Sequence, residues 1–131
     1  MVTVAASGYF NPLHKGHVEY LECARTLGDR LVVIVNSDAQ RALKGSKEFM
    51  DQDERMAIVK ALRCVDEVFL SIDSDGTVCE SLRAVRPDVF AKGGDRFSGE
   101  VPEAGVCDEL GITMVDGLGA KVQSSSWLLA K

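Results

Sequence analysis

Two histidines near the start of the chain, His14 and His17, have the residue type and spacing to bind an anion. They are the only histidines in the sequence, and Gly16 stands between them where a helix is predicted to begin. A helix N-terminus offers free backbone N–H groups and the positive end of the helix dipole. Imidazole N–H groups donate hydrogen bonds to phosphate oxygens, and Lys15 adds positive charge. The segment therefore predicts a phosphate site, although it is neither a Walker loop nor a G-x-G-x-x-G fingerprint.

Two other interpretations of the histidine pair are open. Both side chains could only cap the helix or lie on the surface without a ligand. A zinc site is the second alternative, but no third ligand of a suitable type is near in the sequence. Because both histidines follow the first predicted strand within one glycine-containing turn, the phosphate interpretation is favoured.

The elements that must position these residues follow from the apolar pattern. Short apolar runs bounded by turn-forming residues predict strands at 2–6, 31–35, 67–70, 89–91 and 112–115. Helical patterns lie at 17–27, after Asp51, and at 77–85, 103–110 and 124–130. The first helix is expected to end with Gly28 as its C-cap, and Asp51 with Glu54 resembles a capping box.

Strands that alternate with helices predict an α/β fold: a Rossmann-like, doubly wound, five-stranded parallel sheet with helices on both faces. Ligands of such sheets bind outside the carboxyl ends of the strands, near the switch in strand order. We therefore expect the chemistry to cluster after Ala6, Val35, Ala91 and Val115. Two irregular segments, 44–50 and 92–102, fall in the same region.

Composition limits the class of protein. A chain of 131 residues with 46% hydrophobic residues fits a single domain spanning 1–131. Its 15 basic and 20 acidic residues, a net charge of -5, argue against nucleic-acid binding. No apolar run approaches the roughly 20 residues that span a bilayer, and no signal peptide is recognisable, so a cytoplasmic location without membrane attachment is expected. The four cysteines are scattered without a C-x-x-C pair, which favours reduced thiols.

The pattern Gly8-x-Phe10-Asn11-x-x-His14-x-Gly16-His17 resembles the G-x-F-[D/N]-x-x-H-x-G-H signature of the cytidylyltransferase-like nucleotidyltransferases. The likeness continues along nearly the whole chain. Segment 63–68 is similar to glycerol-3-phosphate cytidylyltransferase, and 92–95 to heptose-1-phosphate adenylyltransferase. Further matches are 27–33, 36–38, Lys44-Gly45, Glu54-Arg55 and the serines 124–126.

This resemblance implies transfer of a nucleoside monophosphate from CTP or ATP to a small phosphorylated sugar, polyol or alcohol, with release of pyrophosphate. The acceptor's own phosphate oxygen would attack in line, so the protein would position the reactants and stabilise charge. Mg²⁺ is expected with the nucleoside triphosphate, but no carboxylate cage for it is visible and no side chain is assigned as a metal ligand. Members of the family commonly form dimers, so a homodimer is expected.

The resemblance also assigns residues to roles. The catalytic candidates are His14, His17 and Lys44. The nucleotide-binding candidates are Gly8, Tyr9, Phe10, Asn11, Gly16, Arg55, Lys92, Gly93, Gly94, Asp95, Ser124, Ser125 and Ser126. Asp38, Lys47 and Arg63 are additional candidates. Arg55 lies near a predicted helix start, where a cation opposes the helix dipole, and this placement favours an anionic partner.

Several positions depart from the family pattern. Tyr9 stands where a small Thr or Cys is usual, Asn11 where Asp is commoner, and Gln123 with three serines replaces the S-T-T motif. Segment 117–122 lacks the arginine of the glycerol-3-phosphate branch. Two alternative functions stay open: an FAD synthase-like or other cofactor adenylyltransferase, and a nucleotide-binding module without catalysis.

Overall fold

The computed structural model describes residues 1–10, 13–44, 50–75, 77–93 and 102–118. Across these ranges five strands form one parallel sheet in the order β3-β2-β1-β4-β5. The strands are β1 (Thr3–Gly8), β2 (Arg30–Val35), β3 (Glu67–Leu70), β4 (Val89–Gly93) and β5 (Thr113–Leu118). The predicted five-stranded parallel α/β sheet is confirmed.

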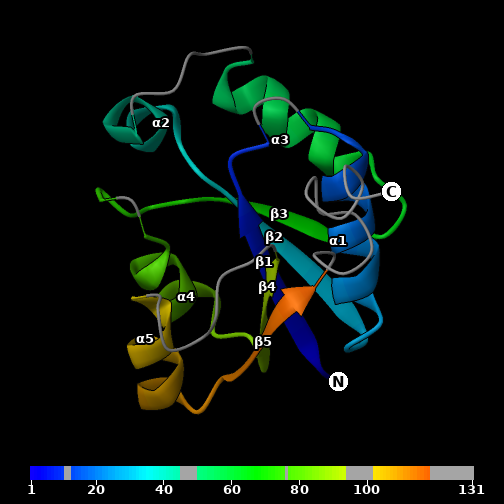
Figure 1. The fold of residues 1–131 in the computed structure, drawn as a ribbon, viewed down its shortest axis with the longest axis vertical. Coiled ribbons are helices and arrows are strands. Elements are labelled where there is room, and N and C mark those ends of the chain that lie inside the picture. Colours follow the sequence, from blue (N-terminus) through cyan, green and yellow to red (C-terminus); the bar gives the residue numbers. More distant parts are fainter. Residues whose placement is uncertain (11–12, 45–49, 76, 94–101, 119–131) are drawn as a thin grey trace, which may run out of the picture.

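Helices cover both faces of the sheet. They are α1 (Lys15–Arg25), α2 (Asp38–Lys44), α3 (Gln52–Lys60), α4 (Cys79–Val85) and α5 (Glu103–Leu110). Figure 1 shows α1 and α3 on one side of the sheet and α4 and α5 on the other. The helix predicted at 124–130 lies outside the described residues. No helix in the described ranges is long and apolar enough to cross a membrane.

The core forms two layers because successive strand residues point to opposite faces. Val4 and Ala6 of β1 pack with the buried residues of α1 and α3, whereas Ala5 packs with those of α4 and α5. The run Leu31–Val35 of β2 is buried throughout, as expected for a strand covered on both sides. The two layers thus hold the strands that lead to the site from both sides.

The first helix differs from the prediction at both ends. It begins at Lys15 because His14 caps it, and it ends at Arg25 with Thr26 as the C-cap. The prediction that Gly28 is the C-cap is therefore wrong. A Cβ on Gly28 would come within 2.7 Å of the Val2 carbonyl oxygen, so this glycine permits close approach of the chain to β1.

Other boundaries also differ. β1 continues beyond Ala6 because Ser7 and Gly8 still pair with β2. The helix predicted at 77–85 begins at Cys79, since the backbone and hydroxyl of Thr77 bond to Asp75 in a turn before it. The short helix α2 was not predicted at all.

Three aspartates close the amino edge of the sheet. Each stands directly before a strand and accepts a hydrogen bond from a backbone N–H at the start of the neighbouring strand. The pairs are Asp29 with Val2, Asp66 with Leu31 and Asp88 with Thr3, each at 2.8 Å. Backbone groups that the sheet ladder leaves open at this edge are therefore satisfied by side chains.

Candidate functional site

The order of strands reverses between β1 and β4. The chain runs outward from β1 to β2 and β3, then returns to the other side of β1 with β4 and β5. β1 and β4 pair only as far as Ala6 and Ala91, and beyond this point β1 follows β2 alone. In parallel sheets such a switch point opens the crevice that binds ligands. The segment that carries the histidines leaves β1 at this switch point.

The two histidines bind the backbone at the start of α1. Nδ1 of His14, the N-cap residue, accepts a hydrogen bond from the Gly16 N–H at 3.1 Å. Nδ1 of His17 accepts one from the His14 N–H, also at 3.1 Å. The rings stack with their centroids 3.9 Å apart and an angle of 29° between the planes. Both histidines therefore cap the helix, and these capping hydrogen bonds hold the two rings side by side.

This arrangement assigns the tautomer of both rings. A ring nitrogen that accepts a hydrogen bond carries no proton, so in each neutral imidazole the proton resides on Nε2. The histidine pair therefore presents two Nε2–H donors that do not take part in the caps. Because the N–H groups of His14 and Gly16 are occupied, the imidazoles are better candidates than these two backbone groups for binding an anion.

His17 is held in its neutral form. Burial, followed by the neighbouring charge of His14, lowers the pKa of His17 from 6.5 to about 4. Phe10 contributes to this environment, because its ring meets the His17 ring edge-on with centroids 5.0 Å apart. At neutral pH His17 is thus a neutral hydrogen-bond donor rather than a cation.

Phe10 reaches this position through an unusual backbone. Its φ of 52° lies in the left-handed region, and its side chain is 1% exposed. A Cβ on Gly8 would come within 2.8 Å of the Phe10 ring, so only glycine fits there. Strained backbone conformations persist where the surroundings enforce them, often at functional sites. The close contact between Gly8 and the Phe10 ring thus holds that ring against the ring of His17.

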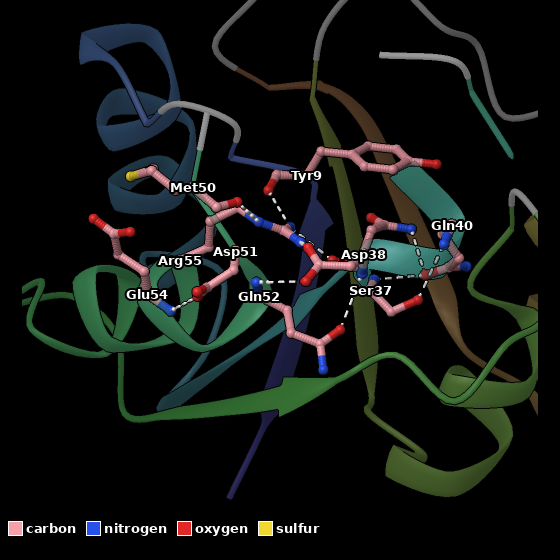
Figure 2. A network of polar contacts seen from close by, with 10 residues as sticks. Tyr9, Ser37, Asp38, Gln40, Met50, Asp51, Gln52, Glu54 and Arg55 are labelled. Carbon is pink, nitrogen blue, oxygen red and sulfur yellow. Dashed lines mark hydrogen bonds and ion pairs between the residues drawn. The ribbon is translucent and has the colours of Figure 1, made fainter. Parts of the chain in front are cut away.

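Arg55 is completely buried and binds protein groups (Figure 2). Its Nη1 donates to the carbonyls of Tyr9 and Asn36, both at 2.7 Å, and its Nε donates to that of Met50 at 3.1 Å. Its Nη2 forms an ion pair with Asp38 at 2.7 Å. The anionic partner expected for this helix-start arginine is therefore Asp38 of the same chain. Arg55 ties the ends of β1 and β2 to the start of α3, and it acts on the site through these segments.

Asp38 and Gln52 bind each other reciprocally, which fixes α2 against α3. The Asp38 carboxylate accepts from the Gln52 N–H at 3.1 Å, and the Gln52 side-chain oxygen accepts from the Asp38 N–H at 3.0 Å. Burial raises the pKa of Asp38, but the hydrogen bonds from Arg55 and Gln52 and the charges of Arg55 and Arg41 outweigh it, so the pKa is lower than usual. Asp38 is therefore a carboxylate at neutral pH, as its partner requires.

Gln40 joins α2 to the segment after β3. This fully buried side chain donates to the carbonyls of Asp75 and Thr77 at 2.6 and 2.8 Å. Its oxygen accepts from the Asn36 side chain and from the Ser37 N–H. Gln40 thus connects the end of β2 with the segment that follows β3, and Figure 2 shows it beside Ser37.

The remaining predicted residues fall into three groups. Lys44 is the last residue of α2, and Lys92 and Gly93 end β4, so all three belong to the carboxyl edge with the histidines. Arg63 is exposed and lies before β3, at the amino edge, so the structure does not bring it to the site. Asn11, Lys47, Gly94, Asp95 and Ser124, Ser125 and Ser126 lie outside the described residues.

Sequence reasoning missed several polar residues that organise this edge. Tyr20, Asn36, Gln40 and Gln52 all bind backbone or side-chain groups between elements. The sequence gives no local signal for the contacts of Tyr20, Gln40 and Gln52, because these contacts join segments that lie far apart along the chain. Among the described residues, no group of three or more His, Cys, Asp or Glu side chains is placed to hold a metal ion.

Comparison with known proteins decides the family. The model of the family described as "Cytidylyltransferase-like" matches residues 5–110. The chain belongs to this family. The resemblance seen in the histidine motif is thereby confirmed, and the matched range contains the switch point, both histidines and Arg55.

Similar proteins include two kinds of named relative. The bifunctional protein HldE of Streptomyces coelicolor is 42% identical over 98% of this chain, which spans only 28% of HldE. The FAD synthase of Thermoplasma volcanium is 33% identical over 87% of this chain and 79% of its own length. The crystal structure of the lipopolysaccharide core biosynthesis protein from Thermoplasma volcanium has a TM-score of 0.74 and 32% identity, covering 89% of this chain and 94% of that one.

Proposed function

We propose that this chain is a nucleotidyltransferase that transfers AMP from ATP to the phosphate of a small phosphorylated acceptor, releasing pyrophosphate. The observation that carries the proposal is the stacked histidine pair at the switch point, with both Nδ1 atoms bound to backbone N–H groups. Fixed hydrogen-bond donors at the switch point suit a reaction in which negative charge develops on phosphate oxygens.

ATP is the proposed donor for two reasons. Segment 92–95 resembles heptose-1-phosphate adenylyltransferases, and one relative is named as an FAD synthase. FAD consists of a flavin phosphate joined to AMP, so its synthesis is an adenylyl transfer. The family description itself names cytidylyl transfer, which makes CTP the competing donor.

The reaction needs no protein nucleophile. An oxygen of the acceptor phosphate attacks the α-phosphorus of ATP, the bond to the bridging oxygen of the β-phosphate breaks, and pyrophosphate leaves. We propose that the Nε2–H groups of His14 and His17 donate to oxygens of the α-phosphate during this step. Because the pKa of His17 is lowered to about 4, its protonation state does not change near neutral pH. Activity near neutral pH should therefore not depend on the titration of His17. Lys44 is the proposed cation for the β- and γ-phosphates.

Mg²⁺ is proposed to accompany the triphosphate and to neutralise part of its charge. Mg²⁺ favours octahedral oxygen coordination and usually keeps several waters in phosphoryl-transfer sites. The described residues offer no preformed acidic cage. Phosphate oxygens and water would therefore supply most of its ligands.

A second acceptor is favoured by a specific observation. The chain spans 79% of an FAD synthase at 33% identity, whereas it spans 28% of the HldE relative. FMN, a phosphate monoester larger than a sugar phosphate, is therefore the alternative acceptor. The nucleophile, the leaving group and the roles of the two histidines would be the same.

The test measures pyrophosphate release by the purified chain with Mg²⁺. ATP and CTP are each paired with hexose and heptose 1-phosphates, glycerol 3-phosphate and FMN, and products are identified by mass. We expect turnover with ATP and one acceptor, and a large loss of kcat in His17→Asn. Nucleotide binding without turnover for any pair would contradict the proposal and favour the non-catalytic module. The homodimer and the cytoplasmic location stay predictions.

A further inference from the structure

The hydroxyl of Tyr20 occupies the point where β1 and β4 separate. Its oxygen accepts a hydrogen bond from the Ser7 N–H at 3.2 Å and donates one to the Ala91 carbonyl at 2.5 Å. Ser7 follows Ala6, the last residue of β1 that pairs with β4, and Ala91 is the partner of Ala6. One side chain therefore joins both strands at the point where their pairing ends.

Tyr20 also belongs to the helix that carries the histidines. It comes three residues after His17, so the two side chains lie on neighbouring positions of the same face of α1. Its side chain is 8% exposed and packs in the core between α1 and the sheet. Burial raises the pKa of Tyr20, so its hydroxyl keeps the proton that it donates to Ala91.

Apolar packing alone does not require this hydroxyl. The other buried residues of α1, Leu21 and Ala24, are apolar, and phenylalanine would fill nearly the same volume as Tyr20. A buried polar group is costly unless it is hydrogen-bonded, and here the two hydrogen bonds go to β1 and β4, the strands on either side of the switch point. The hydroxyl therefore fixes β1 and β4 relative to each other, in addition to the core packing of the ring.

We propose that Tyr20 is a positioning residue that sets where the histidine-bearing segment after β1 lies relative to the end of β4. Lys92 and Gly93 follow Ala91 directly, so a shift of Ala91 relative to Ser7 moves the end of β4 relative to the segment that carries the histidines. The inference rests on the proposed function, because it says that Tyr20 aligns these two segments around the nucleotide.

The test is Tyr20→Phe, with Ser81→Ala as the matched control. Ser81 is also fully buried, and its hydroxyl binds Ser71, Asp73 and Ile72 near β3 and α4, away from β1 and β4. Both variants lose one buried hydroxyl and should lose stability to a similar degree. Small misalignments of reacting groups cost up to about a hundredfold in rate. We expect kcat to fall about ten- to a hundredfold in Tyr20→Phe and less than threefold in Ser81→Ala.

The readouts separate positioning from general weakening. Unfolding in urea measures the stability of both variants, and kcat and KM are measured well below their unfolding transitions. A loss of kcat in Tyr20→Phe alone, with the acceptor KM changed less than threefold, supports the inference. Equal effects of both variants, or unchanged kcat in Tyr20→Phe, overturn it while the proposed function stands. A wild-type chain that neither binds ATP nor releases pyrophosphate overturns the proposed function and the inference with it.

Discussion

Replacing His17 by asparagine separates the two tasks of its imidazole. The asparagine oxygen takes nearly the place of Nδ1 and can still accept from the His14 N–H, a bond of 3.1 Å in the native protein. The shorter side chain ends before the place of Nε2, so the proposed donor to the α-phosphate is lost. Removing one such donor typically costs about 3–4 kcal/mol of barrier, and we expect kcat to fall about 10²- to 10³-fold.

The same variant should change how stability depends on pH. Burial, and then the charge of His14, lower the pKa of His17 from 6.5 to about 4. Between these values the unfolded chain binds a proton that the folded chain does not, so the free energy of unfolding decreases as the pH falls. The stability that neutral His17 contributes, relative to acidic pH, is fully present above pH 6.5 and is lost as the pH falls toward 4. A shift of this size corresponds to about 3 kcal/mol at most, which the partial exposure of the ring reduces to about 1–2 kcal/mol.

Urea unfolding between pH 7.5 and 4.5 measures this contribution. Wild-type stability should fall across the window by about 1–2 kcal/mol more than that of His17→Asn. Parallel pH profiles would refute the argument from burial, and unchanged kcat would refute the role as donor. His17→Gln is the complementary control, because its amide nitrogen reaches toward the place of Nε2 but its oxygen cannot cap. It should retain more activity than His17→Asn and lose about 1 kcal/mol of stability.

Three further predictions concern other parts of the chain. Gly28→Ala should destabilise the fold by about 1–3 kcal/mol without lowering kcat, because its Cβ would meet the backbone oxygen of Val2 at 2.7 Å; chemical unfolding and kinetics check both halves. Arg63→Ala should change kcat and KM less than twofold, since this exposed residue lies at the amino edge, and a larger loss would contradict its placement. Asp38→Asn should lower the free energy of unfolding by about 2–4 kcal/mol, because it leaves the fully buried Arg55 charge without its ion pair; equal urea midpoints would show that the pair contributes nothing.

Periodicity predicted the sheet because its signal is local. Leu31–Val35 is a continuous apolar run that is almost purely β-branched, and such runs are typical of strands buried on both faces. The short helix α2 gave no comparable signal. It is held by contacts between distant segments, such as those of Gln40 with Asp75 and Thr77 and of Asp38 with Gln52. Short helices depend on tertiary packing more than on their own sequence.

The site shows the same division. The spacing of His14 and His17 predicted that both lie at one helix start, and the structure places them there; that they bind phosphate stays a prediction. The surroundings of Arg55 could not be predicted, because an arginine near a helix start has the same sequence whether it meets a ligand or buried carbonyls. Its acceptors Tyr9 and Asn36 follow different strands, and only the completed sheet brings them together.

The aspartates at the amino edge of the sheet determine where a group attached to the start of the chain would leave the fold. Asp29 and Asp88 hold the backbone of Val2 and Thr3, so β1 enters the sheet at a fixed point on the edge opposite the histidines. A tag, a surface linker or a fused domain attached before Met1 would therefore leave from the far end of the strands. A chain immobilised in this way would keep the histidine pair turned away from the support.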